Sequence, residues 1–272
     1  MTEILGDLGG WHSLSNDFEG DELPLIYYHL SIAKEAAETL GSPILLNNLE
    51  NYLGGAISPD AHFVGNVSRL QTHFFDLADD DEQSGPNLMF QQHPCFSDGS
   101  ELEDRTRAFI VGYVSHLIVD DAWTTDIYRP FFGKNSPLGG DTAANMLDRL
   151  LQYETDRWER LDKPRLAAIR EKIRSWNADM DIGILDNTAL CNWRDFVWTT
   201  TVREVDYDDL RLFTQSFLVS RERVNMEQAE AFLKDMPDKI EWVVQYVGEE
   251  RLKAFRSKCI NRSVEIAREY LK

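Results

Sequence analysis

The sequence predicts a single all-α domain spanning its 272 residues. Apolar residues recur at spacings of three and four along most of the chain, which is the period of a helix with one buried face. No run of alternating apolar and polar residues indicates a strand. The hydrophobic fraction of 43% is sufficient for a substantial core, which excludes a disordered chain.

Six stretches are predicted as helices: residues 25–40, 43–53, 101–123, 141–161, 164–176 and 249–271. Gly41 ends the first of these, and the Gly54-Gly55 pair ends the second. Ser100 with Glu103 three residues later forms a predicted capping box for the third. Asp141 is the predicted cap of the fourth, the fifth begins after Lys163, and the last is expected to be an exposed terminal helix.

Two stretches between these helices, residues 58–72 and 79–100, are long, polar and rich in turn residues. Loops of this length in a compact helical domain are usually functional or disordered. The acidic run at residues 79–82 lacks the alternating ligand pattern of a calcium loop, so we interpret it as solvated. The chain divides into a half with the candidate metal residues, at about 20–135, and a histidine-free helical half, at about 140–272.

The composition narrows the classes of function. Asp and Glu number 47 against 28 Lys and Arg, which gives a net charge of −19 and argues against binding to a nucleic-acid backbone. Hydrolysis of a phosphate ester stays compatible with this charge, because bound metal ions reverse the local field. Three widely separated cysteines, no signal peptide and no apolar run of about 18 residues predict a cytoplasmic protein without a transmembrane segment.

The histidines are concentrated at one end of the sequence, since none of the 156 residues after His116 is a histidine. His29 shares the apolar face of its predicted helix and, taken alone, indicates a core histidine. We interpret His62 and His93 as surface residues unless their loops fold over a site. The six histidines are His12, His29, His62, His73, His93 and His116.

The strongest local motif is Gly112-Tyr-x-x-His116-x-x-x-Asp120-x-x-Trp123. His116 and Asp120 are four residues apart and therefore share one face of a helix. That face also carries aromatic residues, so it is the buried one, and a buried Asp needs a hydrogen-bonding partner or a metal ion. The two open interpretations are a pair of zinc ligands and a His–Asp hydrogen bond that joins two helices.

The order His29, Pro59-Asp60, Thr72-His73-Phe74 and then the motif around His116 resembles the zinc-dependent phospholipase C family, whose superfamily includes the single-strand-specific zinc nucleases. The resemblance covers roughly residues 25–135 and implies a multi-helical fold. It implies that Asp60, His73, His116 and Asp120 bind one zinc ion. It further implies that Asp120 bridges to a neighbouring ion, of which His29 is a ligand.

Two features depart from the family. Its neighbouring ion is completed by a processed N-terminal tryptophan, whereas Trp11 is internal here. Its other ion uses two histidines and a glutamate that follow the position of Asp120, where this chain has no histidine. Carboxylates would have to replace them and would favour manganese, iron or magnesium over zinc. The candidates are Asp121, Asp126, Asp141, Asp148, Glu154 and Asp156, of which Glu154 and Asp156 are preferred on their aromatic-flanked helix.

Three functions are compatible with these residues. The first is a metal-dependent hydrolase of a phosphoric ester, such as a phospholipid or a small phosphodiester, in which Asp60 also orients or deprotonates the attacking water. The second is a non-catalytic helical protein with one structural metal ion, which the missing downstream histidines favour. The third is a metal-free helical interaction module. Zinc is the expected ion, and the sequence does not give the oligomeric state.

Overall fold

A computed structural model describes residues 26–75, 84–180, 182–201 and 226–272. Within these ranges the chain forms helices and turns and contains no strand, so the predicted all-α fold is confirmed. The α-helices are α2 (Ile26–Leu40), α3 (Pro43–Asn47), α4 (Leu49–Gly55), α5 (Arg69–His73), α6 (Gly85–Gln92), α7 (Asp104–Trp123), α8 (Arg129–Phe131), α9 (Thr142–Arg160), α10 (Lys163–Ser175), α11 (Asn187–Thr200), α13 (Met226–Lys234), α14 (Met236–Val247) and α15 (Glu249–Tyr270). The short 3₁₀ helices are η1 (Ser58–Phe63), η2 (Pro94–Phe96) and η3 (Gly99–Glu101), and a π-helical turn, η4 (Thr124–Tyr128), follows α7.

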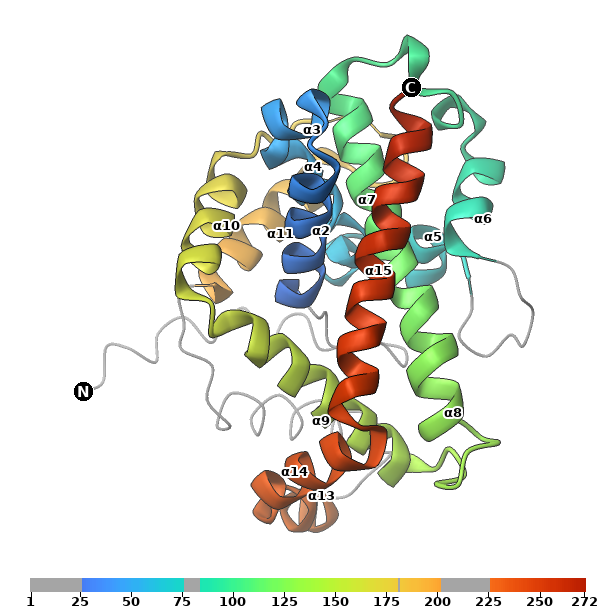
Figure 1. Ribbon diagram of the computed structural model, residues 1–272, viewed down its shortest axis with the longest axis vertical. Coiled ribbons are helices and arrows are strands. Elements are labelled where there is room, and N and C mark those ends of the chain that lie inside the picture. Colours follow the sequence, from blue (N-terminus) through green and yellow to red (C-terminus); the bar gives the residue numbers. More distant parts are fainter. Residues whose placement is uncertain (1–25, 76–83, 181, 202–225) are drawn as a thin grey trace.

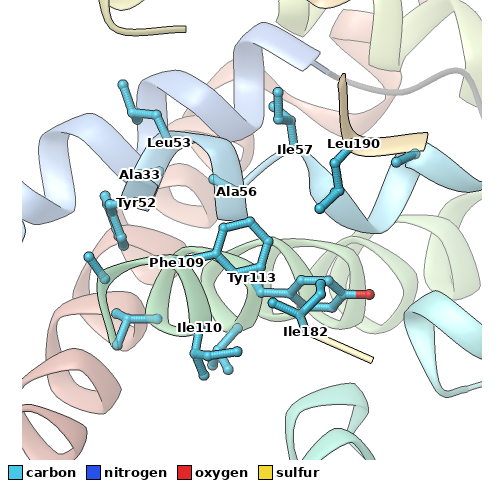
Figure 2. Close-up of a cluster of buried hydrophobic side chains, with 14 of the residues drawn as sticks. Ala33, Tyr52, Leu53, Ala56, Ile57, Phe109, Ile110, Tyr113, Ile182 and Leu190 are labelled. Atoms are coloured by element: carbon cyan, nitrogen blue, oxygen red, sulfur yellow. The ribbon is translucent and has the colours of Figure 1, made fainter. Parts of the chain in front are cut away.

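Helix α7 is the central element, and α2, α4, α6 and α15 pack around it (Figure 1). Every residue from Ala108 to Asp120 is buried, so this helix is enclosed on all sides rather than amphipathic. Figure 2 shows Phe109 and Tyr113 of α7 beside Tyr52 of α4 and Ala56, the residue that follows α4. The functional motif around His116 therefore lies on the most rigidly surrounded helix of the molecule.

Glycines set the distance between α4 and α7. A Cβ atom built on Gly55 would lie 2.0 Å from the Phe109 carbonyl oxygen, and one built on Gly112 would lie 1.9 Å from that of Tyr52. Such a contact is possible only without side chains at these positions. The expectation that Gly54-Gly55 only ends a helix is incomplete, because both glycines belong to α4 and also allow close packing, Gly54 against the Trp176 ring and Gly55 against α7.

The predicted helix at 43–53 is in fact two helices. The backbone leaves the helical region at Asn48, whose side-chain amide donates to the Ile44 carbonyl and separates α3 from α4. The predicted capping box at Ser100 is also wrong, because Ser100 lies in η3 and Glu103 precedes the first residue of α7. The Asp141 cap is confirmed, since its carboxylate accepts from the Ala144 amide.

The stretches expected to be loops are largely helical. Residues 58–72 contain η1 and most of α5, and residues 84–100 contain α6, η2 and most of η3. Helices of one or two turns are too short to show helical periodicity in the sequence. The acidic run at residues 79–82 lies outside the described residues, as do His12 and Trp11.

The terminal helix α15 is not the exposed element that its charged residues suggested. It lies alongside α2 and α7 and buries Leu252, Phe255 and Cys259 (Figure 1). The Ser263 and Ser115 hydroxyls are hydrogen bonded at 3.0 Å between α15 and α7. The histidine-free half thus packs directly on the half with the candidate metal residues, although the division into two halves stays a prediction.

The structure bears on two observations behind the predicted location of the protein, its cysteines and its lack of a transmembrane segment. The three cysteines are free, and Cys259 is buried whereas Cys95 is exposed. Among the described helices, none is long and apolar enough to cross a membrane. The cytoplasmic location stays a prediction.

Candidate metal centre

Four helical elements bring five buried side chains to one point in the molecule. His29 comes from α2, Asp60 from η1, His73 from the last position of α5, and His116 and Asp120 from successive turns of α7. These are the five residues that the resemblance implied. They make up two groups of potential metal ligands, His29–His116–Asp120 and Asp60–His73–His116.

Four atoms of this cluster lie at nearly equal separations. His73 Nε2 lies 3.3 Å from His116 Nε2, 3.4 Å from Asp60 Oδ1 and 3.3 Å from Asp120 Oδ2. His116 Nε2 lies 3.7 Å from Asp60 Oδ1 and 3.6 Å from Asp120 Oδ2. Ligand atoms of a tetrahedral zinc site, at about 2.0–2.1 Å from the ion, are about 3.3–3.4 Å apart. The five distances therefore suit one small cation.

Hydrogen bonds outside the cluster fix which ring nitrogens face inward. His116 Nδ1 donates to the Ala56 carbonyl at 2.9 Å, so the Nε2 atom of the neutral ring carries the lone pair. Thr72 Oγ1 donates to the Arg69 carbonyl and accepts from His73 Nδ1 at 3.0 Å, which gives His73 the same tautomer. Two lone pairs thus face each other across 3.3 Å, an arrangement that a shared cation stabilises.

The charges of the cluster are mutually dependent. Burial raises the pKa of Asp60 and of Asp120, but the nearby imidazoles outweigh it, and both carboxyl pKa values lie below the usual range. Burial lowers the pKa of His116, but the two carboxylates outweigh it and raise that pKa above the usual value. Two ionised carboxylates without bulk water require positive charge: Arg69 supplies one charge beside Asp120, and a proton on His116 or a bound metal ion would supply the rest.

The elements that carry these ligands are held by specific contacts. The Gly55 and Gly112 contact brings the Ala56 carbonyl to His116. The Tyr113 hydroxyl donates to the Thr72 carbonyl at 2.7 Å and so joins α5 to α7 next to His73. Phe74, with a φ of 67°, takes the left-handed conformation that ends α5 directly after His73.

The entry to η1 is held in the same way. The Trp193 indole of α11 donates to the Ile57 carbonyl at 2.7 Å, and the Ser58 hydroxyl donates to the Gly54 carbonyl at 2.7 Å. Pro59 at the start of η1 fixes the backbone dihedral of the residue before Asp60. Asp60 therefore lies on a turn that is held in place by hydrogen bonds and by a proline, which is the support that a metal ligand needs.

His29 forms the beginning of a second group next to the first. Its ring stacks on that of His116 at 3.8 Å between centroids, and its Nε2 lies 3.3 Å from Asp120 Oδ1. Asp120 thus faces both groups, one with each carboxylate oxygen. His116 belongs to both groups, which leaves the second group with fewer ligands that it does not share with the first. Burial and the nearby His116 lower the pKa of His29, which favours its neutral, ligating form.

The structure places the carboxylates proposed for a further ion outside these two groups. Asp156 Oδ1 accepts from the Tyr27 and Tyr28 amides, and its Oδ2 accepts from Arg160. Glu154 accepts from Arg157 and from the Trp158 indole. Both carboxylates thus have structural partners at the start of α2 or within α9.

Asp121 and Asp148 lie near the C-terminal end of α7. Asp121 accepts from the Gly85 amide at 3.0 Å, and burial raises its pKa to about 7. Asp148 accepts from the Trp123 indole at 3.0 Å and from Gln152 at 2.7 Å. Trp123, the last residue of the motif around His116, is therefore a hydrogen-bond donor. Neither carboxylate belongs to the two ligand groups.

Two residues near the centre were not identified as part of it from the sequence. His62 is a buried residue of η1 rather than a surface residue; its ring lies edge-on to that of His73, and burial lowers its pKa to about 4. Arg69 places Nη2 3.2 Å from Asp120 Oδ2. Its position four residues before His73 was the available signal. His93 is half-buried between Phe74 and Phe96.

The comparison with protein families agrees with this geometry. Residues 28–123 match the family model described as zinc dependent phospholipase C. The match covers 96 of the 272 residues and supports an assignment of this segment to that family. It contains all five residues of the centre and ends at the last residue of α7. Searches of the curated proteins and of the solved structures found no match. The family and the buried His and Asp groups together establish a site able to hold a metal ion.

Proposed function

We propose that this protein is a metal-dependent hydrolase of phosphoric esters. The observation that carries the proposal is that His73 Nε2 and His116 Nε2 lie 3.3 Å apart and each lies 3.3–3.7 Å from a carboxylate oxygen of Asp60 and of Asp120, in the segment that matches the phospholipase C family. An ion bound there would polarise the ester phosphate and supply hydroxide from a bound water near neutral pH. Zinc suits the two imidazoles best, and manganese, iron or magnesium would suit a more carboxylate-rich second position.

The side chains of the centre have separate roles in this proposal. His73 and His116 hold the ion, and their outer nitrogens keep the rings oriented through Thr72 and Ala56. Asp120 faces His29 as well as the first group and is the candidate for bridging two ions. Asp60 is the candidate that orients or deprotonates the attacking water, because its carboxylate lies beside His73 and His116 and its pKa is held below the usual range.

The test is turnover of two phosphodiesters by zinc-loaded protein: bis(4-nitrophenyl) phosphate, and phosphatidylcholine in vesicles. Asp60→Asn is expected to keep the fold and lower the rate by at least about 100-fold, the usual contribution of general-base catalysis. His116→Ala is expected to lose both metal and turnover. His93→Ala, which removes a half-buried histidine elsewhere, is the matched control and keeps both. Activity that survives both Asp60→Asn and His116→Ala would refute the proposal.

A second candidate function is a protein with one structural metal ion. The observation that favours it is the absence of any histidine after His116, which leaves only carboxylates for a further ion. In that case chelation would lower the melting temperature, and neither phosphodiester would be hydrolysed by metal-loaded protein. A metal-free interaction module would show neither the thermal effect nor any bound ion.

A further inference from the structure

Helix α10 concentrates positive charge in an acidic protein. Five of its 13 residues are Lys or Arg and one, Glu171, is acidic, whereas the whole chain has a net charge of −19. Figure 1 shows α10 on the outside of the described helices, where it packs against α4 and α11. A local excess of positive charge indicates an anionic partner when the basic side chains are not already paired within the protein.

Two of the five basic side chains have structural partners. Arg165 Nη1 lies 3.2 Å from Glu35 Oε2, and Lys172 Nζ lies 3.0 Å from Glu50 Oε2, so these two residues join α10 to α2 and α4. The other three make no ion pair within the part of the chain that the structure describes: Lys163, Arg170 and Arg174. Their charge is therefore not used to hold helices together.

The three unpaired residues share one face of α10. They are seven and four residues apart in the sequence, so they lie within about 40° of one another around the helix axis and extend over about 16 Å along it. Lys163 and Arg174 are exposed and Arg170 is partly exposed, whereas the buried Ile169 and Ile173 lie on a different face. We call Lys163, Arg170 and Arg174 the basic stripe.

Large apolar side chains are exposed at both ends of the basic stripe. Trp198 of α11 is 37% exposed, and the Arg174 guanidinium lies 5.9 Å from the centroid of a Trp198 ring. Leu161, two residues before the first residue of α10, is 61% exposed. Basic residues together with exposed Trp and Leu are typical of protein surfaces that bind the interface of a lipid bilayer, in which Trp lies at the level of the headgroups.

We propose that the basic stripe and Trp198 bind the surface of a bilayer that contains anionic lipids, with lipid phosphates as the partners of the three basic residues. A nucleic acid offers the same phosphates but no apolar layer for Trp198 and Leu161, so the bilayer suits both kinds of side chain. Carboxylates further from the membrane than the screening length, about 8 Å at physiological salt, oppose this binding only weakly. The proposal is independent of the hydrolase function, because the basic stripe contains none of the five residues of the metal centre.

Flotation of the full chain with vesicles tests the proposal, using phosphatidylcholine alone and phosphatidylcholine mixed with phosphatidylglycerol in equal amounts. We expect binding to the anionic vesicles only, and loss of that binding at about 1 M salt, where the screening length is about 3 Å. Lys163→Gln/Arg174→Gln should keep the helical circular dichroism and weaken binding by about 25-fold, since each basic residue near an anionic membrane contributes about fivefold. Lys253→Gln/Arg268→Gln removes the same two charges from exposed positions of α15 and is the matched control, with unchanged binding.

The outcomes distinguish the basic stripe from other modes of binding. No binding of the wild type to anionic vesicles, or equal weakening in both double variants, overturns the proposal. Binding that is lost on chelation and in His116→Ala, but is unchanged in the α10 variant, places the lipid at the metal centre and also overturns it. Stripe-dependent binding that persists after chelation supports the proposal, whether or not either phosphodiester is hydrolysed.

Two further measurements complete the test. Stripe-dependent binding to a single-stranded oligonucleotide, tighter than the binding to anionic vesicles, would overturn the choice of a bilayer. If the double variant of α10 does not fold, Lys163→Gln alone decides, because this exposed residue is at the first position of the helix. Binding weakened by about fivefold supports the proposal, and wild-type binding counts against it.

Discussion

Substitution of Gly112 by alanine tests whether the close approach of two helices builds the metal centre. The new Cβ would lie 1.9 Å from the Tyr52 carbonyl oxygen, and the next nearest neighbours are also backbone atoms. An ordinary C···O contact is about 3.3 Å, so α4 and α7 would have to separate by about 1.4 Å at this point. A backbone carbonyl cannot rotate away as the end of a flexible side chain can, so the strain is not relieved locally.

The expected loss of stability in Gly112→Ala follows from two opposing effects. Overpacking a well-filled core costs about 1–3 kcal/mol, and a backbone clash is at the upper end of that range. Alanine is favoured over glycine within a helix by about 1 kcal/mol, which offsets part of this cost. We therefore expect Gly112→Ala to lower the free energy of unfolding by about 2 kcal/mol. The bond from His116 Nδ1 to the Ala56 carbonyl crosses the same contact, so zinc affinity should fall by about 10–100-fold.

The assay is urea denaturation of the metal-free protein, combined with a zinc competition titration. Gly139→Ala is the control, because Gly139 has a φ of 76° but open space around its Cβ position. It should cost about 1 kcal/mol from backbone strain and leave zinc affinity unchanged. A Gly112→Ala protein as stable as the wild type, with unaltered zinc affinity, would show that the helix contact does not position His116.

Three further substitutions or reactions are predicted from individual contacts. Thr72→Val removes the acceptor of His73 Nδ1 and should weaken zinc binding by about 10–100-fold with little loss of helical signal, as measured by chelator competition; unchanged affinity would contradict the tautomer assignment. Asp156→Ala leaves Arg160 and two α2 amides without their acceptor and should cost about 3 kcal/mol in urea denaturation, while metal content stays constant; loss of metal would instead place Asp156 among the ligands. Burial raises the pKa of the Cys259 thiol to about 12, so Cys259 should be unreactive towards a disulfide reagent at pH 8 until the protein unfolds, whereas the exposed Cys95 should react rapidly; early labelling of Cys259, identified by mass spectrometry, would show that α15 detaches from the core.

The fold class was predictable because helical periodicity is a local property. The long helix with His116 and Asp120 followed from apolar spacing, and the Asp141 cap followed from side-chain chemistry. The boundaries were less predictable, since Gly54 and Gly55 are a packing surface rather than a stop signal. Glycine has the same sequence signature in both roles, and only the partner helix distinguishes them.

The candidate site was only partly predictable from local sequence. His116 and Asp120 share a helix face by their spacing, whereas Asp60 and His73 joined them only through the family resemblance. Arg69 and His62 were not assigned to the centre, because their proximity depends on how η1 and α5 fold against α7. The carboxylates of α9 illustrate the opposite case, in which acidic residues on a promising helix form structural hydrogen bonds.

The exposure of α15 was also not evident from its sequence. Ten of its 22 residues are charged, and these suggest a solvated helix. Arg256 instead pairs with Glu159 and Glu35, which come from α9 and α2, so part of the charge joins helices rather than facing water. Long-range ion pairs of this kind leave no periodic signal in a single sequence.

Metal content is the most direct test of the central claim, that these His and Asp residues form a metal site. Elemental analysis should be done on protein purified without added metal and without a metal-binding tag. We expect at least one equivalent of zinc, manganese or iron, which His116→Ala loses and His93→Ala retains. Two or more equivalents would support a hydrolytic cluster that includes His29. No bound metal, even after reconstitution with zinc, would contradict the account and leave the centre as a buried hydrogen-bond network.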